Sequence, residues 1–112
     1  MSPRILLVSA LACASAFAAE PAKKQNFAVE VKAGGIHEEC VKLAKGESRR
    51  YQWSSNAVLD FNIHYHEANE VFYPFQRTSV TKGKGTFKAK IDQDYCWMWT
   101  AKTPAKLEGS LR

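Results

Sequence analysis

The chain has 112 residues, of which 16 are Lys or Arg and 11 are Asp or Glu, so its formal net charge is +5. This length suits one domain with a single core. The lysines are scattered as on a solvated surface, so the charge does not predict a nucleic-acid partner. No stretch reaches the roughly 20 apolar residues of a membrane-spanning helix, and we expect a protein that does not span a membrane.

The N-terminal residues 1–18 have the pattern of a secretory signal peptide. One positive charge precedes an apolar run at 5–14, and a small-x-small signature ends at Ala18, after which we expect cleavage. A second interpretation makes Cys13 the lipid-anchored N-terminus of a bacterial lipoprotein, although the preceding Ala-Leu-Ala matches a lipobox only loosely. We therefore expect a periplasmic or secreted protein. The compact leader favours a bacterial periplasm over a eukaryotic source.

Residues 19–26 are polar and aperiodic, which predicts a flexible lead before a domain at 27–112. Loss of the leader leaves two cysteines, Cys40 and Cys96. An even pair of cysteines in an oxidising compartment predicts a disulfide. Because this disulfide would close a long loop, the chain-entropy model gives it roughly 4 kcal/mol of stabilisation.

From Phe27 onward, apolar and polar residues alternate in short runs, which is the period of β-strands and not of helices. Turn residues separate the runs, notably Ser54-Ser55-Asn56 and the segment KGKG at 82–85. The runs lie at 27–31, 36–43, 50–53, 57–66, 70–75, 86–91, 95–101 and 107–111. About eight strands without an amphipathic helix predict an all-β fold, an antiparallel jelly-roll-like β-sandwich.

Four segments together resemble one known family. They are Glu38-Glu39-Cys40, LDFNI at 59–63, GTFKA at 85–89 and DYCW at 94–97. In this order and spacing they are similar to the Golgi-dynamics (GOLD) domain of cargo receptors of the early secretory pathway, over residues 30–112. The resemblance implies a β-sandwich in which a cysteine after acidic residues pairs with one in an aromatic-Cys-aromatic strand. Cys40 and Cys96 match those two positions.

The chain also departs from the family pattern. Gln93 and Trp99 stand where the family usually has a tyrosine and an asparagine. The sequence also shows no pattern of a coiled coil, a transmembrane helix or a cytoplasmic tail, so we do not expect a complete cargo receptor. The resemblance therefore implies a GOLD-like binding module, whose partner is an unidentified protein or small ligand and whose oligomeric state is not predicted.

The stretch AVLDFNIHYHE at 57–67 raises the question of a metal site. Alternation places His64 and His66 on one face of a strand, about 7 Å apart. Glu67 follows in the adjoining loop, and His37 would join them if its strand is a neighbour. Two imidazoles and a carboxylate suit zinc or copper(II). The alternative is an ordinary polar surface, and no other cofactor is predicted.

Aromatic residues gather in three runs and exceed what one face of a small core needs. One interpretation is packing on both sides of a twisted sandwich. The other leaves part of the set exposed as a docking patch for a protein, peptide or glycan, chiefly Tyr73, Trp97 and Trp99.

Signatures of catalysis are weak. No glycine-flanked serine is placed for a strand-to-helix turn, and spacing singles out no pair of carboxylates. Gly83-Lys84-Gly85 is too short for a phosphate loop. We therefore predict a non-enzymatic binding module. The alternative is a periplasmic copper- or zinc-binding protein that uses His64 and His66.

Overall fold

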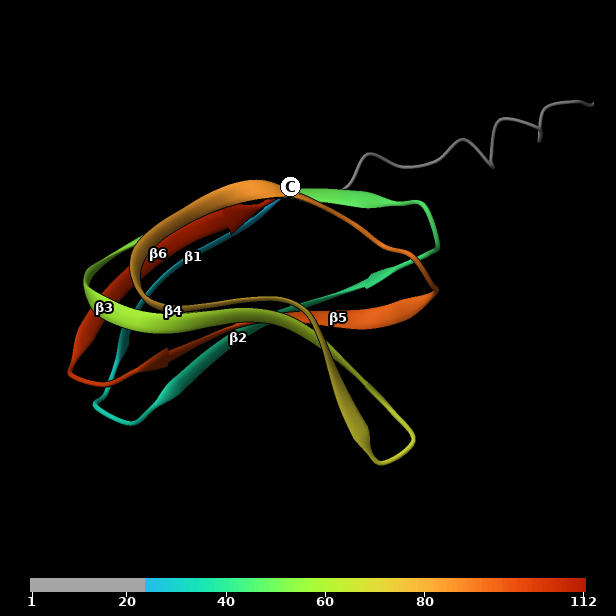
Figure 1. Cartoon of the computed structure of the whole chain (residues 1–112). Coiled ribbons are helices and arrows are strands. Elements are labelled where there is room, and N and C mark those ends of the chain that lie inside the picture. The colour runs from blue at the N-terminus through green and yellow to red at the C-terminus, as the bar shows by residue number, and fades with distance from the viewer. Residues whose placement is uncertain (1–23) are drawn as a thin grey trace, which may run out of the picture.

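The computed structural model describes residues 24–112, which form six antiparallel β-strands (Figure 1). The predicted signal peptide at 1–18, the lipoprotein alternative at Cys13 and most of the lead at 19–26 lie outside these residues. The strands are β1 (Gln25–Val31), β2 (Ile36–Leu43), β3 (Ser48–Glu67), β4 (Glu70–Lys88), β5 (Gln93–Ala101) and β6 (Ala105–Leu111). Within 24–112, no helix has the length and apolarity needed to cross a membrane.

The 20-residue strand β3 organises the fold because it belongs to both halves of the sheet. Its residues 51–55 pair with β6, and its residues 59–64 pair with β5. The strand order is β1-β6-β3-β5-β2, and β4 pairs along β3. The sheet thus curls over itself into a sandwich-like fold, which confirms the predicted all-β antiparallel class (Figure 1).

The strands are longer and fewer than the sequence predicts. Turns are expected at 54–56 and 82–85, but β3 and β4 run through both segments. Ser54 pairs with Lys82, and pairing resumes at Leu59 opposite Val80 after a register shift. Pairing along two long strands outweighs the local turn preference of Ser, Asn and Gly, and the extra β3 residues are accommodated as a β-bulge.

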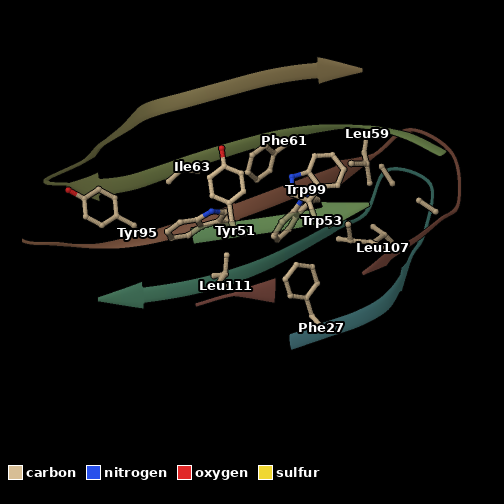
Figure 2. Packing of buried hydrophobic residues seen from close by; sticks show 14 of the residues in the cluster. Phe27, Tyr51, Trp53, Leu59, Phe61, Ile63, Tyr95, Trp99, Leu107 and Leu111 are labelled. Atoms are coloured by element: carbon tan, nitrogen blue, oxygen red, sulfur yellow. The ribbon is translucent and has the colours of Figure 1, made fainter. Parts of the chain in front are cut away.

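Seven of the 16 buried core residues within 24–112 are aromatic (Figure 2). Tyr95, Trp97 and Trp99 alternate along the inner face of β5, and the two tryptophans are 0% exposed. Phe61 of β3 stacks on Trp99 with ring centroids 5.3 Å apart. The prediction that Trp97 and Trp99 belong to a docking patch is therefore wrong. β5 lies between β2 and β3, so its alternate residues point into the core.

Aromatic packing offsets an unfavourable feature of this core. The indole N–H groups of Trp53, Trp97 and Trp99 are buried without a hydrogen-bond partner among the described residues. Each such group costs about 1–3 kcal/mol. Burial of a large apolar side chain contributes up to about 3 kcal/mol, and favourable ring contacts add about 0.5–1.5 kcal/mol per pair. These gains act against the cost of the unpartnered N–H groups.

Two glycines let β4 pass close to the core aromatics. Gly83 lies opposite Trp53 and Gly85 lies opposite Tyr51. A Cβ at Gly83 would lie 2.6 Å from Trp53 Nε1, and a Cβ at Gly85 would lie 2.9 Å from the Tyr51 hydroxyl oxygen. The glycines that predict a turn instead provide room for two aromatic rings.

Candidate functional site

The outer face of the β2-β5-β3 layer carries the predicted disulfide. Cys40 of β2 lies directly opposite Cys96 of β5, and their sulfur atoms are bonded, which confirms the pairing. On the other side of β5, Cys96 lies opposite His64 of β3. One row across three strands thus joins the disulfide to a histidine that the sequence singles out.

Both ring nitrogens of His64 have a polar neighbour. Nδ1 lies 2.7 Å from Oδ1 of Asn62, an acceptor, so Nδ1–H donates this hydrogen bond. Nε2 lies 3.3 Å from Oε2 of Glu38. Asn62 comes two residues before His64 on β3, and Glu38 comes two residues before Cys40 on β2, so alternation places both on the outer face. The Nε2 side of the imidazole therefore faces a carboxylate.

His64 is only 3% exposed although it belongs to an outer face. A register shift at this point of the β3–β4 pairing accompanies a close approach of Tyr73, whose ring centroid lies 5.8 Å from that of the imidazole. Burial lowers the pKa of His64 below its usual range, Glu38 opposes this shift, and His66 reinforces it. Burial therefore disfavours the charged form of this imidazole.

The other two predicted ligands near the end of β3, His66 and Glu67, are both exposed. The rings of His66 and His64 have centroids 5.2 Å apart, so the two histidines are neighbours, as alternation predicts. Glu67 lies opposite Glu70 at the end of the hairpin. The structure thus brings the two histidines together and places Glu67 at the hairpin tip.

His37 does not join this cluster. Along β2, His37 and Glu39 are half-buried while Glu38 and Cys40 are exposed, so the two pairs lie on opposite faces. His37 Nε2 lies 2.8 Å from Oε2 of Glu39, and its ring centroid lies 5.5 Å from that of Phe27. The predicted three-histidine site is therefore wrong, because a shift of one residue along a strand moves a side chain to the other face.

Glu38 is the acidic neighbour that the sequence reasoning missed. A carboxylate oxygen of Glu38, a ring nitrogen of His64 and Sγ of Cys96 lie within 4.8 Å of one another. The sequence did contain a clue to Glu38. Glu38 lies two residues before Cys40, and residues two apart on a strand share a face, so Glu38 lies on the face of β2 that carries the disulfide. The cluster consists of one carboxylate and one imidazole beside an oxidised cysteine pair.

The β3–β4 hairpin extends beyond the sandwich (Figure 1). Near its tip, Val71, Phe72 and Tyr73 are 39%, 37% and 46% exposed. Phe72 stacks on Tyr65 of β3 with ring centroids 5.2 Å apart. Among the described strands, β4 pairs with β3 alone, so its other edge has unpaired backbone groups. Of the three predicted docking residues, Tyr73 is the one that reaches the surface.

No protein-family model matches the chain, and no curated protein matches it. The crystal structure of the Yersinia pseudotuberculosis-derived mitogen (YPM) is similar, with a TM-score of 0.51 and 9% sequence identity, over 80% of this chain and 84% of the mitogen chain. An identity this low shows the fold alone. The fold and the outer-face cluster thus define a small β-sandwich with one disulfide.

Proposed function

We propose that this chain is a secreted or periplasmic, non-enzymatic binding module that takes up an extended peptide segment of a protein partner at the β3–β4 hairpin. One observation carries the proposal. Val71, Phe72 and Tyr73 are consecutive exposed apolar residues on a strand whose outer edge is unpaired within residues 24–112. A general binding role also agrees with the resemblance to the GOLD domain, which stays a prediction.

An unpaired strand edge favours a peptide over a glycan. An extended peptide adds a strand through its backbone, and its alternate side chains pack on the apolar surface beside that edge. A glycan would use the aromatic rings and leave the backbone groups unpaired.

The two halves of β4 differ in how they protect this edge. Natural proteins guard edge strands with lysines, prolines and bulges. The second half of β4 carries three lysines, at 82, 84 and 88, after a register shift. Residues 70–73 contain no lysine or proline; the register shift opposite Ile63–Tyr65 comes at Tyr73, and Pro74, which has no N–H to donate, ends this stretch. The open edge is therefore short and lies at the exposed apolar run.

Two features support the proposed compartment. Disulfides persist mainly in secreted and periplasmic proteins, and Cys40 and Cys96 are bonded. The pattern of residues 1–18 is the one expected of an exported protein.

Selection of a phage-displayed random peptide library on the oxidised protein tests the proposal. We expect enriched apolar peptides whose dissociation constant rises at least about tenfold in the Phe72→Ala/Tyr73→Ala variant, since buried aromatic anchors dominate binding energy. Val58→Ala and Ile91→Ala, which truncate exposed apolar residues away from the hairpin tip, are the matched controls and should keep the affinity. Failure to enrich any peptide, or equal binding to the hairpin variant, would refute the proposal.

A further inference from the structure

The outer-face contact between His64 and Glu38 differs from the other histidine–carboxylate contact in the described chain. His37 and Glu39 lie 2.8 Å apart and form a hydrogen bond. The corresponding atoms of His64 and Glu38 are 3.3 Å apart. Charge-assisted N–H···O bonds are about 2.7–2.9 Å long, so the first pair fits that description and the second is too long for it.

The longer separation fits two ligands of one metal ion. Zinc binds histidine nitrogen and carboxylate oxygen at about 2.0–2.2 Å, usually as a tetrahedron. Two ligand atoms about 2.1 Å from such an ion lie about 3.4 Å apart when they subtend the tetrahedral angle. The observed 3.3 Å between Nε2 of His64 and Oε2 of Glu38 is close to this value.

Asn62 orients the imidazole for this role. Because its Oδ1 accepts the hydrogen bond from Nδ1–H of His64, the nitrogen left free to offer a lone pair to a cation is Nε2, the atom nearest Glu38. A lone pair and a carboxylate oxygen repel each other unless a proton or a cation lies between them. Metal-binding histidines usually donate their other N–H to an oxygen in this way, which fixes the ring and its tautomer.

His66 offers a third ligand. Its ring centroid lies 5.2 Å from that of His64, at an interplanar angle of 75°. Its ring nitrogens are not grouped with the ligand atoms of Glu38 and His64 within 4.8 Å, so this exposed side chain would turn about its two rotatable bonds toward an ion held between those residues. Cys96 Sγ is also near, but its bond to Cys40 removes the thiolate that binds metals. Water would complete the tetrahedron.

We propose that Glu38, His64 and His66 form a zinc-binding site on the outer face of the β2-β5-β3 layer. This site is additional to the proposed peptide-binding edge. Its failure and the failure of the peptide proposal are distinguishable, since each has its own probe and its own variants. The Phe72→Ala variant, which keeps the Tyr73 ring beside His64, should still bind zinc.

Calorimetric titration of zinc chloride into untagged, oxidised protein tests the site. We expect one ion per chain, and an affinity that falls at least about tenfold in Glu38→Gln and in His66→Ala. Both replaced side chains are solvent-accessible, so these variants should fold. Glu39→Gln and Glu67→Gln are the matched controls and should bind zinc as the wild type does. No saturable binding, or an equal loss in the Glu39→Gln variant, would overturn the proposal.

Replacement of the buried His64 could unfold the protein, and a loss of zinc binding would then not show that His64 is a ligand. The role of His64 is therefore tested on the wild-type protein. Copper(II) serves as a paramagnetic substitute for zinc in a proton NMR titration of the histidine rings. The ring signals of His64 and His66 should broaden at substoichiometric copper, and excess zinc should restore them. Equal broadening of His37, which lies on the opposite face of β2, would contradict the proposed ligand set.

Discussion

The Glu38 carboxylate of β2 lies 3.3 Å from Nε2 of His64 on β3, although β5 runs between the two strands. The β5 residue opposite His64 is Cys96. Its side chain is bonded sideways to Cys40 of β2. The disulfide therefore links β2, which carries Glu38, to β5, which pairs with the strand of His64. It also closes a long loop of the chain.

Removal of this disulfide should destabilise the protein markedly. We expect the Cys40→Ala/Cys96→Ala variant to lose about 2–4 kcal/mol of unfolding free energy, because its unfolded state regains the entropy of an open loop. Urea denaturation checks this. Dithiothreitol should lower the midpoint of the wild type and leave that of the double variant unchanged. A loss below about 1 kcal/mol would show that the bond contributes little.

The close approach of β4 to Trp53 predicts a cost for any side chain at Gly83. Because a Cβ there would lie 2.6 Å from the indole Nε1, we expect Gly83→Ala to lower stability by about 1–3 kcal/mol in thermal or urea unfolding. Lys82→Ala, one residue away on the exposed strand, should change stability by no more than about 0.5 kcal/mol. In a Trp53→Phe background the cost of Gly83→Ala should shrink. An unchanged cost would mean that the indole is not the obstacle.

Burial of the tryptophans predicts their fluorescence behaviour. Trp53, Trp97 and Trp99 are all buried in the core, so iodide should quench the folded protein weakly. Guanidinium unfolding should raise the quenching constant severalfold, which provides the internal control. Equal quenching before and after unfolding would contradict the described core.

The buried tyrosine of β5 predicts a loss of stability at alkaline pH. Burial raises the pKa of Tyr95 above its ordinary value of 10.0, and its hydroxyl donates to the Ile91 carbonyl oxygen at 2.8 Å. The unfolded state deprotonates first, so this contribution is fully present below pH 10.0 and is lost as pH rises through the folded-state pKa.

Denaturation at several alkaline pH values measures this effect. Tyr95→Phe should reduce the slope of stability against pH. A wild type whose stability stays flat well above pH 10.0 would argue against a buried tyrosine hydroxyl.

Much of the fold could be predicted because two signals in the sequence are local. Alternation of apolar and polar residues from Phe27 onward indicates strands. The two cysteines that remain once the leader is discounted indicate a disulfide. The strand count could not be predicted, since the segments at 54–56 and 82–85 favour turns locally. They become strand through pairing with distant residues: 82–85 pair with 51–54 of β3, and Ser55 pairs with Leu107 of β6. That pairing joins residues far apart in the sequence.

The candidate site was predictable only in part for the same reason. Alternation places His64 beside His66, but their acidic neighbour, Glu38, comes from a strand whose position depends on the sheet order. His37 is adjacent to Glu38 in sequence and lies on the other face. Trp97 and Trp99 resemble an exposed aromatic patch until β5 is placed between two strands.

The most direct test of the proposed peptide-binding role is an amide NMR titration of the oxidised protein with a selected apolar peptide. We predict that shifts concentrate on residues 70–73, and that amides there become protected from hydrogen exchange as the peptide pairs with the β4 edge. Shifts confined to the edges formed by β1 or β2 would contradict the account.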